Sequence, residues 1–494
     1  MSPGIEQSIK NQVKPRNYKI NASLVSRIIP VVLFLHDNTQ SDPVVKANNN
    51  PIVVFWFRRD LRLEDNKGLY QALKSGRKVL PLFIFDESVI DPLPGNDHRV
   101  SFIYQSLASM DESLQNNGGG LLIKRGKPLE VIRELLSDYP VEAVYCNMDH
   151  EPYGRKRDYE VAGLLNDHGI SFHTFWDHLL LHPEKVLKQD GTPYQVFTPY
   201  SNRWKQILQS GDLEYHASEK LLKHIMPEQS MPGPEQSSLF PDLTELGFTW
   251  SSLKTPSPKI DKDLIRAYDR LRDFPAAEGT SKLGVHLRFG TLGIRNLAKI
   301  AAELNEVFLG ELIWREFYAM ILWYYPEVVD QAFKPAYDRI EWRNNEKEFL
   351  AWKEGNTGYP MVDAGMRQLN QTGYMHNRLR MVTASFLTKH LLIDWRWGEA
   401  YFAEKLFDYE LSSNNGGWQW CAGSGCDAAP YFRIFNPYSH QKKFDPQDEF
   451  VKKWVPEADS EDYVLEIVAH KKARERCLQV YKRALEATSN KNGQ

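Results

Sequence analysis

Short apolar runs separated by helical patterns fill the first third of the chain. The first run is Ile-Val-Val-Phe-Trp-Phe at residues 52–57, and similar runs recur at residues 79–85, 121–123, 143–146 and 171–175. Apolar strands that alternate with helices predict βαβ units and a parallel sheet. Beyond residue 246 the apolar residues follow helical spacing almost to the C-terminus. The predicted fold is therefore an α/β N-terminal domain with a Rossmann-like parallel sheet, followed by an all-α C-terminal domain.

The chain has 494 residues, of which 42% are hydrophobic, and this suffices for two or three domains with sizeable cores. Residues 1–50 are polar and show no sustained periodicity, so we expect a flexible N-terminal extension. The α/β domain is assigned to residues 51–177, and the proline-rich residues 178–246 are assigned to an interdomain linker. Residues 247–494 form the predicted helical domain, with long helical patterns at residues 300–325 and 361–392.

Lysine and arginine total 61 against 64 aspartate and glutamate residues, so the net charge is -3. The chain has no overall excess of positive charge that would point to a polyanionic partner. A nucleic-acid site would therefore have to be a local basic patch. The four cysteines lack C-x-x-C spacing, which argues against zinc and against a secreted disulfide framework. The apolar residues 28–35 are too few to span a bilayer. We therefore expect a cytoplasmic monomer without a metal ion or a membrane partner.

Charged residues follow the first predicted strand, at the place where a dinucleotide-binding fold carries G-x-G-x-x-G. The chain reads Arg58-Arg59-Asp60-Leu61-Arg62 here. Such side chains do not make the glycine turn that lets a backbone approach a pyrophosphate, so no dinucleotide is expected in this domain. We expect these charged residues to join the two domains through ion pairs.

Two tryptophans separated by one residue end the run Asn-Asn-Gly-Gly-Trp-Gln-Trp at residues 414–420, where the two glycines predict a turn. Aromatic side chains at this density serve as core, as platforms for nucleobases or as redox-active neighbours of a flavin. Upstream, one predicted helical face combines a carboxylate, a guanidinium and two aromatic rings, from Glu311, Trp314, Arg315 and Tyr318. This face fits either a solvated ion pair beside a buried tryptophan or a ligand site.

Four segments of the second half carry a resemblance to a known family. They are residues 311–318 (Glu-Leu-Ile-Trp-Arg-Glu-Phe-Tyr), 358–369 (Gly-Tyr-Pro-Met-Val-Asp-Ala-Gly-Met-Arg-Gln-Leu), 375–381 (Met-His-Asn-Arg-Leu-Arg-Met) and 414–420. Together with residues 57–62 they resemble the photolyase and cryptochrome family, in order and with similar spacing over about residues 51–485. Within this family the chain most resembles the class I photolyases, which repair cyclobutane pyrimidine dimers in DNA.

The resemblance implies a non-covalently bound FAD in the helical domain, active as reduced FADH⁻. Its phosphates are expected near the hydroxyls and amides of residues 279–281, which we expect to open a helix. An ion pair between Arg380 and Asp408 is expected beside the flavin ring, and Asn414 is expected to face flavin N5. Gly284 stands where many relatives have serine, which weakens one expected phosphate contact without removing the site. The implied cofactor-binding residues are Tyr268, Thr280, Ser281, Arg315, Asn377, Arg380, Asp408, Glu410 and Asn414.

The implied substrate is UV-damaged DNA whose cyclobutane pyrimidine dimer is flipped out of the duplex. The dimer would stack against Trp314 and Trp420 and pack against Met381, and Glu311 would hydrogen-bond a base carbonyl. Glu311, Asn414 and Met381 are therefore the implied catalytic residues. Flanking phosphates would be contacted by Arg272, Arg378 and Arg433.

In the family's mechanism light excites FADH⁻, an electron passes to the dimer, the cyclobutane bonds split and the electron returns. This chemistry needs no general base or metal. Photolyases of the (6-4) type carry histidines where this chain has Asn377 and Met381, so the resemblance favours the cyclobutane dimer, and His376 is expected to be packed or flavin-adjacent. The family's electron relay to oxidised flavin implies Trp342, Trp395 and Trp418.

A cryptochrome, a light-sensing protein on the same scaffold without repair activity, is the competing function. Signalling relatives often replace the residue at Asn414, and many add a long C-terminal tail, so the chain favours repair. A flavin-binding redox protein without DNA would not explain Glu311, Trp314 and Trp420 together.

A second, antenna chromophore is possible, and its identity is open. Folate-binding relatives carry Asn-Glu where this chain reads Glu151-Pro152-Tyr153-Gly154-Arg155, which argues against a folate. A deazaflavin, a second flavin or an empty pocket all remain.

Overall fold

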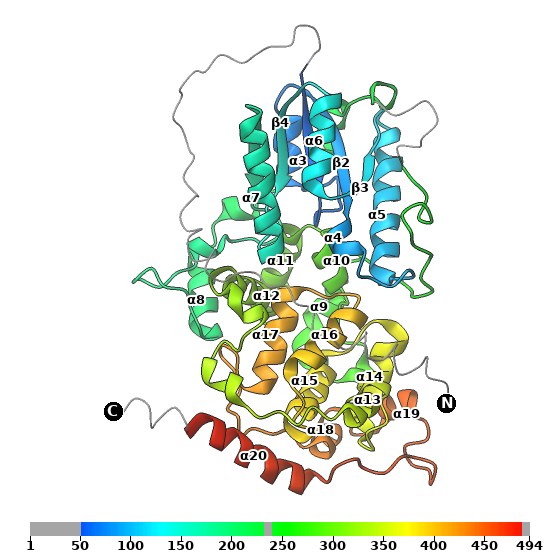
Figure 1. Ribbon diagram of the computed structural model, residues 1–494, viewed down its shortest axis with the longest axis vertical. Coiled ribbons are helices and arrows are strands. Elements are labelled where there is room, and N and C mark those ends of the chain that lie inside the picture. Colours follow the sequence, from blue (N-terminus) through cyan, green and yellow to red (C-terminus); the bar gives the residue numbers. More distant parts are fainter. Residues whose placement is uncertain (1–50, 232–239, 487–494) are drawn as a thin grey trace. The chain divides into compact units, whose positions relative to one another are not determined.

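The computed structural model describes residues 51–231 and 240–486. Its first half is built around a parallel five-stranded sheet (Figure 1). The predicted extension at residues 1–50 lies outside the described residues. The strand order is β3-β2-β1-β4-β5, and every neighbouring pair is parallel. The predicted Rossmann-like sheet is thus confirmed, with strands β1 Ile52–Phe57, β2 Lys78–Asp86, β3 Leu122–Gly126, β4 Val141–Asn147 and β5 Ser171–Phe175.

Helices cover both faces of the sheet because its central strands are apolar on both faces. Val53, Phe55 and Phe57 of β1 pack in one cluster with α3 (Lys67–Leu73) and α5 (His98–Gln115). The alternate residues Ile52, Val54 and Trp56 pack with α6 (Pro128–Asp138) and α7 (Pro152–Asp167). This alternation is expected for a strand buried on both sides. A further short helix, α4 (Glu87–Ile90), follows β2.

The second half is helical, as predicted. No strand occurs within residues 240–486, and none of the described helices is long and apolar enough to cross a membrane. A π-helical turn, Phe386–His390, directly continues α15. The helices are α9 Lys262–Leu271, α10 Gly284–Phe289, α11 Ile294–Leu304, α12 Glu306–Tyr324, α13 Glu346–Glu354, α14 Pro360–Thr372, α15 Asn377–Ser385, α16 Trp395–Lys405, α17 Leu411–Ala422, α18 Pro437–Phe444, α19 Glu449–Trp454 and α20 His470–Glu486.

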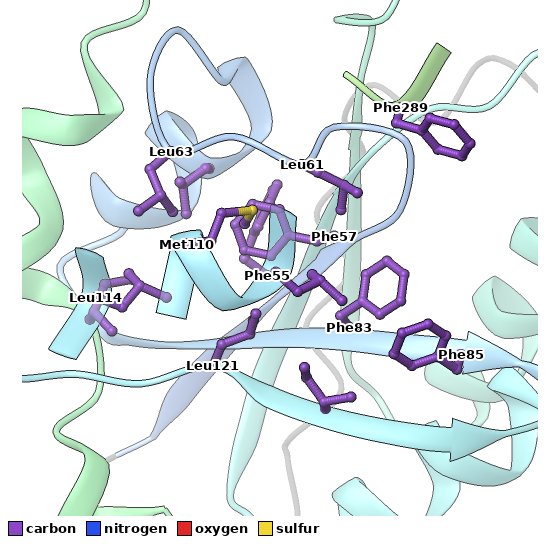
Figure 2. Close-up of a cluster of buried hydrophobic side chains, with 14 of the residues drawn as sticks. Phe55, Phe57, Leu61, Leu63, Phe83, Phe85, Met110, Leu114, Leu121 and Phe289 are labelled. Carbon is purple, nitrogen blue, oxygen red and sulfur yellow. The ribbon is translucent and has the colours of Figure 1, made fainter. Parts of the chain in front are cut away.

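The hydrophobic core on the α3 and α5 side of the sheet continues into the helical half. Figure 2 shows Phe289 of α10 in the same cluster as Phe55, Phe83 and Phe85 of the sheet. Phe407, which precedes α17, belongs to this cluster as well. Because each fully buried side chain of this size contributes roughly 1.5–3 kcal/mol, the shared core holds the two halves together.

The predicted linker, residues 178–246, packs against both halves in its described parts. It contains α8 (Phe197–Ile207) and several short 3₁₀ helices. Trp204 of α8 packs with α11 and α12, whereas Leu222 and Leu246 join the core beneath the sheet. Glu316 of α12 accepts hydrogen bonds from Leu180 N and Trp204 Nε1, both at 2.6 Å, and burial raises the pKa of its carboxyl to about 7. The connection is therefore an ordered layer and not an extended tether.

Ion pairs join the sheet to the helical half, as predicted for the charged segment after β1. Asp177 is fully buried and pairs with Arg62 and with Arg295 of α11, whose Nη2 lies 2.7 Å from Oδ1. Burial alone would raise the pKa of Asp177, but the two guanidinium groups lower it to about 2. Arg58 and Asp60 of the same segment bond within the α/β half instead.

Some local predictions were wrong. Gly416 and Gly417 lie inside α17 and do not form a turn. A Cβ at Gly416 would lie 2.1 Å from the ring of Tyr318, so this glycine permits α17 to pack closely on α12. The helix expected to open at residues 279–281 begins at Gly284. The helical pattern at residues 300–325 divides at Asn305, whose side chain accepts from the first amides of α12.

We predict that Gly416→Ala destabilises the protein by about 1–3 kcal/mol, because the added methyl group would overlap the ring of Tyr318. Gly417→Ala is the matched control, since no atom lies within 4 Å of a Cβ there. In the same helix this control should be stabilising by roughly 0.5–1 kcal/mol. Thermal denaturation of both variants measures the difference, and equal melting temperatures would contradict the close packing of α12 and α17.

Candidate functional site

The charged side chains of the predicted α12 face do not pair with one another. Glu311 forms an ion pair with Arg272, which follows the last residue of α9. Arg315 turns away from Glu311 and donates to His178 O, directly after the α/β half, at 2.9 Å and to Leu287 O of α10 at 3.1 Å. Burial lowers the pKa of Arg315 to about 10. A solvated pair between Glu311 and Arg315, the alternative interpretation of this face, is therefore excluded.

Glu311 lies among two arginines and a second carboxylate. Arg378 of α15 pairs with Asp273 at 2.6 Å, and Asp273 directly follows Arg272 in the chain. Burial raises the pKa of Glu311, and the positive charges of Arg272 and Arg378 oppose that rise. The fold thus brings Glu311 together with two of the three predicted phosphate contacts. The third, Arg433, is exposed on the loop after α17.

Trp314 and Trp420 come from two helices in direct contact, α12 and α17. Trp314 lies one turn before Tyr318, which contacts Gly416 of α17. Trp418 is buried in the core, whereas Trp420 is only partly buried, because residues two apart point to different sides of a helix. A partly exposed indole on each helix is what stacking on a flat ligand requires.

The predicted ion pair between Arg380 and Asp408 is present, with Nη2 2.9 Å from Oδ2. A Cβ on Gly284 would lie 3.0 Å from the same oxygen, so the glycine makes room for this carboxylate. The hydroxyl oxygens of Tyr374 and Thr280 are hydrogen-bonded at 2.9 Å. The charges of Arg380 and Asp408 act on the pKa of Tyr374 in opposite directions. Tyr374, which the sequence did not single out, therefore lies between the predicted phosphate-side and flavin-side residues.

Asn414 is held by Glu399, a residue that the sequence did not single out. The amide nitrogen of Asn414 donates to the backbone oxygen of Glu399 at 3.1 Å and to its Oε1 at 2.9 Å. Because a backbone carbonyl can only accept, these contacts determine which end of the Asn414 amide faces Glu399, and they leave its oxygen for a ligand. Burial raises the pKa of Glu399 to about 7. Only the pairing of α16 with α17 reveals this contact.

Three residues of interest, His376, Asn377 and Met381, lie at and just after the N-terminal end of α15. Asn377 is exposed, and the sulfur of Met381 lies 3.8 Å from Arg378 Nη1. His376 caps the helix, since its Nδ1 accepts from Arg378 N at 3.1 Å. Burial lowers the pKa of His376 to about 4, so its ring is neutral at pH 7 and is packed, as predicted.

The three tryptophans of the predicted relay belong to one core cluster or pack against it. Trp418 and Trp395 are each 2% exposed, and Trp342 is partly buried against the same cluster. A Cβ at Gly398 would lie 2.1 Å from the ring of Trp418, so this glycine admits the indole. Exposure thus increases toward Trp342, which is the order that a relay from the interior to the surface requires. The relay itself stays a prediction.

Glu410 belongs to a buried charge cluster at the junction of the two halves. It caps α17 by accepting from Ser413 N at 2.9 Å, and it lies 3.0 Å from His150 Nε2. His150, Glu151 and Glu410 are close enough to hold one metal ion. Arg59, however, already pairs with both carboxylates, at 2.8 and 3.6 Å. Because this guanidinium supplies the positive charge, an ion-pair network explains the cluster better than a cation site does.

Comparison with known proteins assigns the chain to a family. Residues 53–221 match a family model described as DNA photolyase, and residues 308–460 match the FAD binding domain of DNA photolyase. A deoxyribodipyrimidine photo-lyase from Synechococcus sp. is 39% identical, over 82% of this chain and 88% of the relative. The chain belongs to the DNA photolyase family.

Solved photolyase structures share the fold of this photolyase. A bacterial class III photolyase from Agrobacterium tumefaciens has a TM-score of 0.76 at 33% identity, covering 90% of this chain and 100% of that chain. An archaeal photolyase from Sulfolobus tokodaii, described with two FAD molecules, has a TM-score of 0.75 at 34% identity, covering 87% and 99%. Both halves of the molecule are therefore those of a photolyase.

This photolyase is an FAD protein, and its helical half provides polar groups suited to the cofactor. Gly284 leaves room for Asp408, whose carboxylate is balanced by Arg380. Asn414 is 9% exposed and has its amide direction fixed by Glu399. These groups would hold a flavin and set its charge state, which is the protein's contribution to flavin chemistry.

Gly154 and Tyr153, in the segment that follows β4, both make close contacts within the α/β half. A Cβ at Gly154 would lie 2.5 Å from Cγ of Asp149, so a glutamate there would require Asp149 to move. The hydroxyl of Tyr153 is engaged with Asp86 of β2. The absence of a folate antenna stays a prediction from the sequence, and a deazaflavin, a second flavin or an empty pocket all remain.

We predict that Glu399 makes the protein less stable as pH rises. The folded protein holds the Glu399 proton up to about pH 7, whereas the unfolded chain releases it near 4.5. Between these values the folded state binds one proton more, so the free energy of unfolding falls with rising pH, on the order of 1 kcal/mol per pH unit. Urea denaturation at pH 5, 6 and 7 should show a shallower fall for Glu399→Gln than for the wild type.

The matched control for this measurement is Glu404→Gln, at an exposed carboxylate on the same helix. Its pH dependence should follow that of the wild type. Burial also raises the pKa of Glu316 to about 7, so Glu316 lowers the free energy of unfolding with rising pH in the wild type and in both variants. The informative quantity is therefore the difference in pH dependence between each variant and the wild type. An unchanged slope in Glu399→Gln would show that Glu399 is ionised throughout this range.

Proposed function

We propose that this photolyase repairs cyclobutane pyrimidine dimers in DNA, as a deoxyribodipyrimidine photo-lyase whose relatives carry that name. The observation that carries the proposal is the arrangement around Glu311. This carboxylate lies on the same helix as Trp314, next to Arg272, and α12 contacts the helix that carries Trp420. One hydrogen-bonding group and two stacking surfaces thus meet beside arginines that can bind phosphate.

In this proposal Trp314 and Trp420 stack on the flipped dimer, and Met381 packs against it. Glu311 hydrogen-bonds a base carbonyl; burial raises the pKa of its carboxyl toward a form that can donate this bond, and the ion pair with Arg272 opposes that rise. Donation to an oxygen that gains negative charge stabilises that charge in a site shielded from water. The dimer carries no charge of its own, so apolar and stacking contacts suit it.

Flanking phosphates are assigned to Arg272, Arg378 and Arg433. Arg272 and Arg378 pair with Glu311 and Asp273, so DNA binding exchanges these carboxylates for phosphates. Arg433 makes no ion pair within the described residues and is available directly. Three such contacts predict a clear loss of affinity with salt and no dependence on base sequence.

FAD in its reduced form supplies the light-driven electron chemistry of repair. The chain itself binds and orients the dimer, and it holds Asn414 through Glu399. His376 cannot act as a charged general acid, because its ring is neutral at pH 7. The absence of a charged acid is compatible with splitting a cyclobutane ring, because that reaction needs no proton transfer. It is not compatible with repair of a lesion that requires proton transfer. Trp342, Trp395 and Trp418 are proposed to reduce oxidised flavin before repair.

We further propose that the protein acts as a cytoplasmic monomer. All four cysteines are free thiols and buried, in keeping with a reducing compartment. The alternative function is a cryptochrome-type photoreceptor, which would keep the flavin site and lack dimer repair.

The test is illumination of the reduced holoprotein with DNA that contains cyclobutane thymine dimers, followed by recovery of thymine absorbance against a dark control. Glu311→Ala should lower the repair rate about 10- to 100-fold, the range expected for a lost hydrogen bond to a charged group. Trp314→Ala should weaken dimer binding about 5- to 150-fold through lost stacking. Glu306→Ala, at an exposed residue in the first turn of the same helix, is the control and should repair as the wild type does.

Light-dependent recovery in the wild type and the control, with loss in the two site variants, would support dimer repair. A protein that binds FAD and photoreduces it, yet splits no dimer, would reject the proposal in favour of the photoreceptor. Equal repair by the wild type and Glu311→Ala would remove Glu311 from the catalytic set.

A further inference from the structure

Phe197 lies flat against Trp314, although the two residues belong to elements far apart in the sequence. Their ring centroids are 3.7 Å apart and the ring planes differ by only 5°. Phe197 is the first residue of α8, in the segment predicted as a linker, and Trp314 is in the middle of α12. Trp314 is only partly buried, and its ring also contacts Tyr318, with centroids 5.5 Å apart and planes at 34°.

Aromatic pairs usually prefer offset or edge-to-face packing, so this parallel contact is imposed by its surroundings. Phe317, which is fully buried, meets Trp314 edge-on at 83° and Phe197 at 78°. The backbone N of Phe197 donates to Asp427 Oδ2 at 3.1 Å, which ties it to the loop that follows Trp420 and α17. Phe197 is thus held from two sides.

Helix α8 is itself anchored to α12 by a buried carboxylate. Glu316, two residues after Trp314, accepts from Trp204 Nε1 of α8 at 2.6 Å and from the amides of Leu180 and Leu181 at 2.6 and 3.2 Å. These bonds fix the backbone of α8 relative to α12, so the helix that carries Phe197 cannot shift away from Trp314 without disturbing them.

We propose that Phe197 is a positioning residue for lesion recognition. It holds the indole of Trp314 in one plane and covers one of its faces, so that the base of a flipped pyrimidine dimer stacks on the indole surface that stays exposed. A free indole would lose rotational freedom when the dimer binds, and the contact with Phe197 removes that freedom beforehand. This inference rests on the proposed repair function, because it assigns the ligand of the exposed indole surface.

A purely structural role for Phe197 makes a different prediction. If the ring only filled the core, its loss would lower stability and would affect damaged and undamaged DNA alike. If it orients Trp314, its loss should weaken binding of dimer-containing DNA selectively, because contacts to undamaged DNA are made by phosphate-binding residues elsewhere.

The experiment compares Phe197→Leu, which keeps apolar volume without a ring, with the control Phe197→Tyr, which keeps the ring. Binding of the FAD-loaded proteins to single-dimer and undamaged duplexes is measured at one salt concentration, beside melting temperature and flavin content. Phe197→Leu should bind dimer DNA roughly three- to tenfold more weakly. Its affinity for undamaged DNA, and the properties of Phe197→Tyr, should match the wild type.

A double-mutant cycle with Trp314→Ala separates orientation from other effects. In the Trp314→Ala background, Phe197→Leu should cause no further loss of dimer affinity. An equal loss for both DNAs, an additive loss in the double variant or no loss in a folded Phe197→Leu would overturn the proposal. If Phe197→Leu does not fold, Phe197→Met takes its place under the same criteria. Failure of the wild type to prefer dimer DNA would instead overturn the proposed function.

Discussion

The ion pair between buried Asp177 and two arginines is the interaction on which the geometry of this photolyase depends. Asp177 ends the α/β half, and the residues directly after it bind the site helix: His178 accepts from Arg315, and the amides of Leu180 and Leu181 donate to Glu316. One short segment thus joins the sheet to α12. Removing one partner of such a buried pair costs roughly 3–5 kcal/mol, because the remaining charges stay buried and uncompensated.

Pairing of arginines with carboxylates also explains how a chain with a net charge of -3 can present a site for DNA. Two arginines, Arg272 and Arg378, lie near Glu311, where Glu311 and Asp273 pair with them. Such pairs at a partly exposed site contribute little to stability, so phosphates can replace the carboxylates at small cost. Association would then be governed by a local field and would fall steeply with salt.

Burial shifts several titratable groups around the site toward their neutral forms. His376 is neutral because burial lowers its pKa, and Glu311 and Glu399 have raised pKa values because burial disfavours their charges. The protein therefore offers hydrogen bonds and apolar surface more than strong acids or bases. This environment suits a reaction in which a bound cofactor supplies an electron and the protein positions both partners.

The sequence alone determined the parallel sheet, the helical second half and the spacing of Glu311 with Trp314, because periodicity and motifs are local properties of the chain. It misplaced the glycines of α17 as a turn, since their reason is contact with Tyr318 on another helix. Residues that act across elements escaped it: Glu399 behind Asn414, Tyr374 between Thr280 and Asp408, and Phe197 against Trp314. Only the tertiary structure decided these contacts, because the hydrogen bonds and ring stacks that define them join residues from 15 to 117 positions apart, from Asn414 and Glu399 to Phe197 and Trp314.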